Sequence, residues 1–98
     1  MEIDITADDK GTIAALTGRL DTNTAPQLEE ALAGLDPAGS LLLDFGALSY
    51  LSSAGLRVLL AAHKRFAKSG GGLTIRRANE SVLDVFEMTG FSDILNLE

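Results

Sequence analysis

The chain has 98 residues and a net charge of −6, with 46% hydrophobic residues and no cysteine. This length predicts a single domain over residues 1–98, and the acidic balance argues against non-specific nucleic-acid binding, which needs a basic surface. Without cysteine there is no disulfide, thiolate metal site or cysteine nucleophile. No run of about 18 apolar residues is present to insert into a membrane, and the acidic N-terminus does not resemble a signal peptide, so we expect a cytoplasmic protein.

The N-terminal segment predicts a β-hairpin. Residues 2–6 alternate between apolar and polar side chains, with Ile3 and Ile5 on one face, as a half-buried strand does. Residues 8–11 are typical of a turn, and residues 12–17 form the second strand.

A helix is expected to begin after Thr24, because Thr24 and Gln27 have the spacing of a capping box. Apolar residues then recur at the spacing of one helical face. They are Leu28, Ala31, Leu32 and Leu35. The turn-forming residues 36–39 end this helix.

The segment from Leu41 to Leu60 is the most informative part of the chain. Residues 41–45 predict a buried strand, a short loop follows, and a helix is expected over residues 53–68. Its inward face has Leu56, Leu59, Leu60 and Phe66, and its outward face has Arg57, Lys64, Arg65 and Lys68. Three glycines at 70–72 end the helix.

The last third of the chain predicts one more strand and one more helix. The strand covers residues 73–77, and the helix starts at Asn79 and stops at Gly90. Val82, Val85 and Phe86 point inward from this helix. Residues 91–97 form a short helix or strand packed on the end.

The order β-β-α-β-α-β-α predicts an α/β fold. We expect an N-terminal β-hairpin followed by alternating helices and strands, in a mixed, mostly parallel sheet of four strands with three to four helices. Parallel strands send their outgoing loops to one edge, where open α/β sheets bind ligands. Those loops are residues 18–24, 46–53 and 77–80, and they would bring together Asp21, Ser52, Ser53 and Asn79.

Two serines lie where a strand gives way to a helix. The first N–H groups of a helix lack intrahelical partners and carry partial positive charge, so an anion binds there readily. A serine at such a place is either a helix cap or an acceptor for a phosphate. Spacing alone leaves both interpretations open for Ser52 and Ser53.

Three segments resemble the STAS domain, the family of sulfate transporters and anti-sigma factor antagonists, and in particular its free-standing bacterial antagonists. Residues 16–21 with Thr24 and Ala25 resemble the family signature after the second strand. Residues 42–56 resemble the strand, loop and entry of the switch helix, and residues 82–91 resemble the last helix. The resemblance runs in order over essentially the whole chain and implies a STAS-type fold.

The resemblance also implies a regulatory interaction module with no catalytic activity and no cofactor. Such proteins bind a serine-kinase anti-sigma factor and so release its sigma factor. The kinase phosphorylates them to end the binding, and a serine phosphatase resets them. The acceptor lies two residues before the motif's glycine, which is Ser53 here, with Ser52 as the alternative. The implied partner-binding residues are Asp21, Thr24, Tyr50, Ser52, Ala54, Gly55 and Arg57.

The chain departs from the commonest family pattern on both sides of the acceptor. Ser52 replaces a frequent aspartate, and Ala54 replaces a frequent serine or threonine, so Ser52 offers a second candidate hydroxyl. Gly55 is expected to permit a close approach of a partner or a phosphate. On that hypothesis Gly55→Ala leaves the fold intact and weakens binding.

Several alternatives remain for single residues and for the whole chain. Asp21 either stabilises a turn or contacts a partner, and Tyr50 either packs against the protein or contacts a partner. The basic stripe, which consists of Arg57, Lys64, Arg65 and Lys68, is either a solvated face or a docking surface. The runner-up function is a STAS subunit of a transport or lipid-trafficking complex that docks to an ATPase without a phospho-switch.

An enzyme is disfavoured because no nucleophile–base pair or metal cluster is present. His63 is isolated, Asp44 has no partner carboxylate, and residues 70–72 lack the Walker pattern. We expect no metal, no nucleic-acid partner, no membrane insertion and a monomeric protein.

Overall fold

Five strands and three helices follow one another in the computed structural model, which describes all 98 residues. The elements are β1 (Glu2–Asp8), β2 (Gly11–Leu20), α1 (Ala25–Ala33), β3 (Ser40–Leu51), α2 (Ser53–Lys68), β4 (Gly72–Arg76), α3 (Glu80–Thr89) and β5 (Asn96–Leu97). A turn of 3-10 helix at Phe91–Asp93 links α3 to β5.

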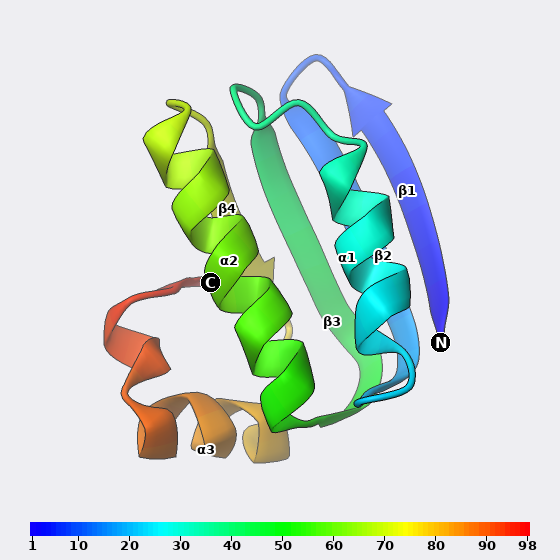
Figure 1. Ribbon diagram of the computed structural model, residues 1–98, viewed down its shortest axis with the longest axis vertical. Helices are drawn as coiled ribbons and strands as arrows, with labels where there is room; N and C mark the ends of the chain where they lie inside the picture. The colour runs from blue at the N-terminus through cyan, green and yellow to red at the C-terminus, as the bar shows by residue number, and fades with distance from the viewer.

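The sheet has the order β1-β2-β3-β4-β5, with β1 antiparallel to β2 and all other neighbours parallel. Helices α1 and α2 lie on the same face of the sheet, and α3 lies across one end (Figure 1). The α/β class, the hairpin and the mostly parallel sheet are therefore confirmed. The sheet has five strands rather than four, because Asn96 and Leu97 pair with β4.

Strand β3 is longer than its apolar run predicts. After Phe45 it continues to Leu51, and its last residues pair with Gly18, Arg19 and Leu20 of β2, with register shifts before Thr17 and between Gly18 and Arg19. The expected loop after residue 45 is therefore strand. Only Ser52 separates β3 from α2, so the end of the sheet leads directly into the helix.

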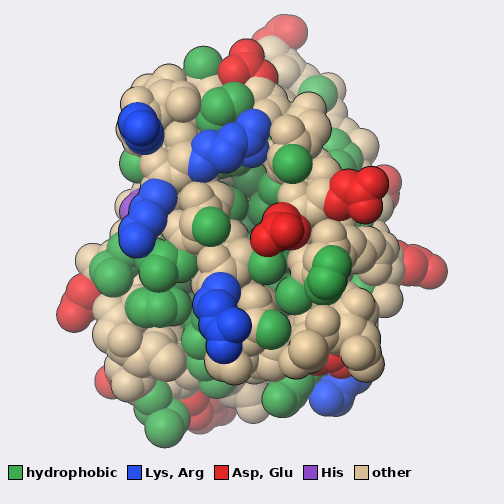
Figure 2. Space-filling model, viewed as in Figure 1, with side chains coloured by type: hydrophobic (Ala, Val, Ile, Leu, Met, Phe, Trp, Pro, Cys, Tyr) green, Lys and Arg blue, Asp and Glu red, His purple; other side chains and the backbone are tan.

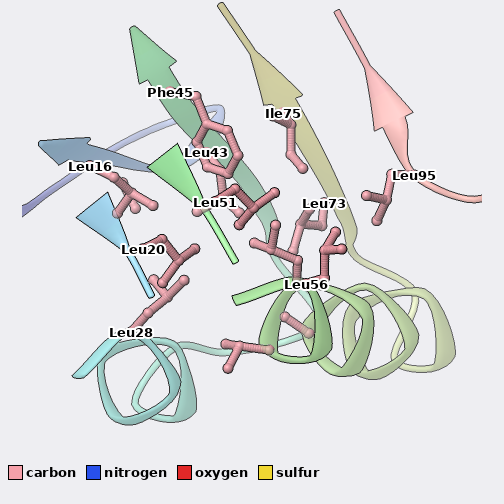
Figure 3. Close-up of a cluster of buried hydrophobic side chains, with 14 of the residues drawn as sticks. Leu16, Leu20, Leu28, Leu43, Phe45, Leu51, Leu56, Leu73, Ile75 and Leu95 are labelled. Atoms are coloured by element: carbon pink, nitrogen blue, oxygen red, sulfur yellow. The ribbon is translucent and has the colours of Figure 1, made fainter. Parts of the chain in front are cut away.

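The core lies between the sheet and the helices and consists of one cluster of 21 buried hydrophobic residues. Side chains such as Leu43 and Phe45 of β3 point from the sheet toward Leu28 of α1 and Leu56 of α2 (Figure 3). On α2 the buried face differs slightly from the expected one. Val58 and Ala62 are buried, whereas Leu60 is only half-buried.

The N-terminus of α1 has no capping box, contrary to the sequence-based expectation. Thr24 occupies the N-cap position, but its side chain makes no capping bond. Gln27 instead donates from Nε2 to the carbonyl of Met1 at 2.9 Å. The residue pair has the right spacing, but each side chain has a partner elsewhere.

The C-terminus of α1 is capped by a residue of the neighbouring helix. Arg65 of α2 donates to the carbonyl oxygens of Leu32 at 2.9 Å and Leu35 at 2.7 Å. Helix α1 has no basic residue in its own last turn, so Arg65 supplies the cation that a helix C-terminus favours. Arg65 thus does not belong to a purely solvated stripe, although basic side chains do gather along α2 opposite acidic ones over α1 (Figure 2).

None of the helices is both long and apolar enough to cross a membrane.

Candidate functional site

The carboxyl ends of β2 and β3 meet at one edge of the sheet, because these two strands are parallel. The backbone N–H of Ser52 donates to the carbonyl of Leu20 at 2.9 Å, which ties the start of α2 to the end of β2. Asn79 donates from Nδ2 to the carbonyl of Leu48 at 3.1 Å. The loops expected to share one edge therefore do so.

Ser52 is the N-cap of α2. Its backbone is extended, and its Oγ accepts a hydrogen bond from the N–H of Gly55. The donor–acceptor distance is 3.4 Å, longer than the usual range for such a bond. Ser52 therefore fixes the start of α2 in two ways. Its side chain accepts a weak hydrogen bond from Gly55, and its backbone N–H donates a hydrogen bond of normal length to Leu20.

Ser53 is the first residue of α2 and is exposed. Its hydroxyl makes no hydrogen bond within the protein, in contrast to that of Ser52. An incoming group can thus reach Ser53 without breaking a contact. The 16-residue helix that follows aligns its dipole with partial positive charge at this end.

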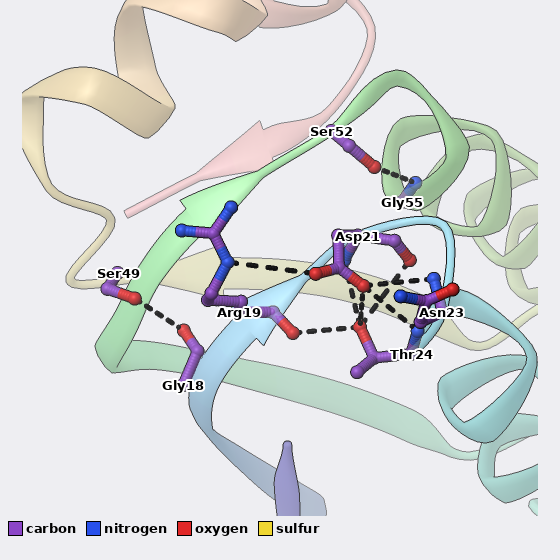
Figure 4. A network of polar contacts seen from close by, with 8 residues as sticks. All are labelled: Gly18, Arg19, Asp21, Asn23, Thr24, Ser49, Ser52 and Gly55. Carbon is purple, nitrogen blue, oxygen red and sulfur yellow. Dashed lines mark hydrogen bonds and ion pairs between the residues drawn. The ribbon is translucent and has the colours of Figure 1, made fainter.

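Asp21 organises the loop between β2 and α1 (Figure 4). Its Oδ1 accepts from the N–H groups of Asn23 at 2.9 Å and Thr24 at 3.1 Å. Partial burial raises the pKa of Asp21, but these hydrogen bonds and the charge of Arg19 outweigh it, so the net pKa is lowered. Asp21 is therefore an ionised turn residue placed beside the start of α2.

Thr24 locks the same loop through its hydroxyl. Oγ1 accepts from the N–H of Asp21 at 2.8 Å and donates to the carbonyl of Arg19 at 2.8 Å. The loop's position thus depends on Asp21 and Thr24 together, which the sequence identified as separate contact residues.

Tyr50 belongs to a pair that the sequence did not reveal. It lies opposite Arg19 on the neighbouring strand, and the Arg19 guanidinium lies 4.2 Å from the centre of its ring. Tyr50 as a whole remains 41% exposed, so it is stacked rather than buried. Only the pairing of β2 with the unexpected extension of β3 brings these two side chains together.

Gly55 lies on the buried side of α2, not on its accessible side. A Cβ added there would lie 2.6 Å from Cγ of Leu20 and 2.8 Å from Cδ1 of Leu51. This crowding argues against the expectation that Gly55→Ala leaves the fold intact. The glycine is needed because the first turn of α2 packs directly on the ends of β2 and β3.

Ala54 and Arg57 line a shallow groove between α1 and α2, together with Thr22, Ala25 and Pro26. Arg57 is exposed and has no ion-pair partner in the protein. Its guanidinium, one turn beyond Ser53, is free to meet an anion.

Asp44 is the only buried charged residue, and its partners could not be predicted from the sequence. It forms hydrogen bonds with Arg77 and with the N–H of Gly46, and an ion pair with Arg76 at 3.3 Å. The hydrogen bond from Arg77 is the main cause of a pKa lowered to about 2. Asp44 thus stabilises the structure and has no proton to exchange at neutral pH. No group of three or more histidines and carboxylates is close enough to hold a metal ion.

Comparison with known proteins connects this geometry to a family. The family model described as "Mlab, STAS domain" matches residues 3–96. The chain belongs to the STAS domain family. A Bordetella bronchiseptica protein, BtrV, described as a candidate anti-sigma factor antagonist, is 40% identical over 84 residues, which cover 84% of this chain and 72% of BtrV. The anti-sigma-B factor antagonist of Bacillus subtilis is 29% identical over 98 residues, covering 99% of this chain and 90% of that protein.

Solved structures agree with these relatives. An anti-sigma factor antagonist from Mycobacterium paratuberculosis superposes with a TM-score of 0.84 at 25% identity, covering 98% of this chain and 83% of that one. The Bacillus antagonist SpoIIAA in its phosphorylated form superposes with a TM-score of 0.75 at 16% identity, covering 99% and 91% of the two chains. The STAS-type fold and the resemblance to anti-sigma factor antagonists are thereby confirmed. The family comprises regulatory, protein-binding domains rather than enzymes.

Proposed function

We propose that this protein is an anti-sigma factor antagonist that binds a serine-kinase anti-sigma factor and releases its sigma factor. Its contact surface is the edge formed by the β2–α1 loop, the end of β3 and the start of α2. The accessible contact residues are Asp21, Thr24, Tyr50, Ser52, Ala54 and Arg57. Gly55 supports this surface from below.

In this proposal, phosphorylation of Ser53 ends the interaction. The observation that carries it is the contrast between the two serines. Ser52 caps α2 and is tied to β2, whereas Ser53 is exposed at the first helical position with a free hydroxyl. A phosphate at a helix N-terminus is received by free N–H groups, and Arg57 is close enough along the helix to approach it.

The phosphate acts on the interface rather than on the fold. It adds about −1.5 to −2 charges and three acceptor oxygens. Asp21, which is ionised, repels it, as does any acidic group on the docked partner. Losing a contact and burying an unpaired charge at an interface costs several kcal/mol, or roughly tens- to thousands-fold in affinity.

The relatives support this assignment. Two proteins that resemble this chain over most of its length carry names that contain anti-sigma factor antagonist. SpoIIAA, which shares the fold, exists in a phosphorylated form. A cytoplasmic monomer reset by a serine phosphatase completes the proposed cycle.

Kinase treatment followed by fragment-ion mass spectrometry tests the switch. With ATP and the anti-sigma factor kinase of the same genome, we expect one phosphate, mapped to Ser53. Ser53→Ala should remain unmodified and bind permanently, and the control Ser52→Ala should still be phosphorylated. A phosphate on Ser52 contradicts the acceptor assignment.

A second candidate is a STAS subunit that docks constitutively to an ATPase, which the match to the Mlab model favours. In that case no phosphate appears on either serine. The protein then binds an ATPase of a transport complex, and Ser53→Ala binds it as the unaltered protein does.

A further inference from the structure

The stacked pair Arg19 and Tyr50 is the most prominent feature of the site that the phospho-switch does not use. Both side chains are accessible: Arg19 is 60% exposed and Tyr50 is 41% exposed. The guanidinium Cζ lies 4.2 Å from the centre of the Tyr50 ring, and the guanidinium N–H groups of Arg19 form no hydrogen bond within the protein. Tyrosine and arginine are the residue types that concentrate binding energy at protein interfaces.

The backbone that carries Arg19 is held in place at three consecutive carbonyl groups, and Figure 4 draws the bonds to the first two. Gly18 accepts from Oγ of Ser49 at 2.9 Å, Arg19 accepts from Oγ1 of Thr24 at 2.8 Å, and Leu20 accepts from the N–H of Ser52 at 2.9 Å. A side chain on such a support loses less freedom when a partner binds it, and this favours affinity.

The hydrogen-bonding capacity of Arg19 is unused. Its only ion-pair partner in the protein is Asp21, with Nε 3.7 Å from Oδ2, which is too long for a hydrogen bond. The other oxygen of Asp21 is already occupied by two backbone N–H groups. By contrast, Arg65 and Arg77 are both bonded within the protein.

We infer that Arg19, held by Tyr50, is a recognition residue that binds a carboxylate of the anti-sigma factor kinase. This inference rests on the proposed function, because the partner is the anti-sigma factor kinase. Arg19 lies at the proposed contact surface, since its neighbour Leu20 accepts a hydrogen bond from Ser52 at the start of α2. A planar guanidinium with free edges binds a carboxylate through two parallel hydrogen bonds. A nucleic-acid base also stacks on such a pair, but the net charge of −6 opposes the phosphate backbone that would accompany it.

Titration calorimetry with the purified anti-sigma factor kinase tests this inference, with ADP present so that no phosphate is transferred. Arg19→Met keeps the aliphatic stem and removes the charge, and we expect at least about tenfold weaker binding. Arg19→Lys should lose part of this affinity, because an ammonium group does not form the paired contact. Lys68→Met removes the same charge at the far end of α2 and should bind as the unaltered protein does.

Substitutions of Tyr50 test whether the ring positions the arginine. Tyr50→Phe should bind nearly normally, whereas Tyr50→Leu should weaken binding several-fold. Combining Tyr50→Leu with Arg19→Met should weaken binding by less than the product of the two single effects, because the side chains act as a pair. Thermal melts of every variant establish that the fold is retained.

The outcomes separate this inference from the proposed function. If the unaltered protein binds the kinase but Arg19→Met binds equally well, the recognition role of Arg19 is wrong and the antagonist function stands. If Arg19→Met and Lys68→Met weaken binding equally, only the overall charge matters and the inference again fails. If the unaltered protein does not bind the kinase, the proposed function itself fails.

Discussion

Arg77 donates two hydrogen bonds to the buried carboxylate of Asp44, from Nε to Oδ1 at 2.9 Å and from Nη2 to Oδ2 at 2.8 Å. Asp44 belongs to β3, and Arg77 follows β4 with a left-handed backbone at φ 60°. Gly46 leaves room for this contact, since a Cβ there would lie 2.6 Å from Nη2 of Arg77. The pair thereby ties the start of the β4–α3 loop to the middle of the sheet.

The Asp44 contact predicts a loss of stability in acid. The pKa of Asp44 falls from 3.8 to about 2 on folding, mainly because Arg77 bonds its charged form. A group whose pKa is lower in the folded state stabilises the protein above its unfolded pKa, and the effect disappears as the pH falls from about 4 toward 2. Because Arg77 is 66% exposed and the pair is partly screened, we expect about 1–2 kcal/mol.

Urea denaturation at several pH values checks this prediction. The free energy of unfolding should fall more steeply between pH 4 and pH 2 in the unaltered protein than in Asp44→Asn. If the free energy of unfolding falls with pH equally in the two proteins, the ion pairs of Asp44 with its arginines do not stabilise the fold.

Gly55→Ala should destabilise the protein, because the new methyl group overlaps Leu20 and Leu51. Overpacking typically costs about 1–3 kcal/mol, which exceeds the gain of up to about 1 kcal/mol from replacing glycine in a helix. The matched control is Gly72→Ala, where no atom lies within 4 Å of the added Cβ. Thermal melting should show a lower midpoint for Gly55→Ala only. A higher midpoint would mean that the helix start moves freely.

Arg65→Met should destabilise the contact between α1 and α2. The substitution leaves the last carbonyl groups of α1 without their charged donor, and hydrogen bonds to charged groups are worth about 1.5–3 kcal/mol. Lys68→Met, on an exposed position of the same helix, should have little effect. Equal unfolding free energies for the two variants would exclude a capping role for Arg65.

Thr24→Val should loosen the switch-site loop, because valine keeps the shape but cannot bond Asp21 or Arg19. Each lost hydrogen bond costs about 0.5–1.5 kcal/mol. Thr24→Ser retains the hydroxyl and should restore most of the stability. Hydrogen exchange at the amide of Asp21 gives the local readout, and protection unchanged in Thr24→Val would refute the locking role.

The order of elements and the position of Ser52 and Ser53 at the start of α2 follow from local patterns. Apolar periodicity located α2 and α3, and the N-cap signal of Asn79 and the stop at Gly90 appear as expected. These features depend on neighbours in the sequence, which is why they can be predicted from it.

The features that were missed depend on pairing between distant segments. Residues 46–51 contain a glycine and a serine and read as a loop, yet they extend β3 because β2 pairs with them. The Arg19–Tyr50 stack follows from that pairing. The capping role of Arg65 and the burial of Gly55 likewise depend on how α2 packs against α1 and the sheet.

The affinity of the anti-sigma factor kinase for the unmodified and the Ser53-phosphorylated protein tests the central claim most directly. Both forms can be titrated into the same kinase preparation with ADP present, after mass spectrometry has verified a single phosphate at Ser53. The account predicts that the unmodified protein binds the kinase tightly. Phosphorylation should lower this affinity by roughly tens-fold or more. Equal affinities for the two forms would contradict a switch at Ser53.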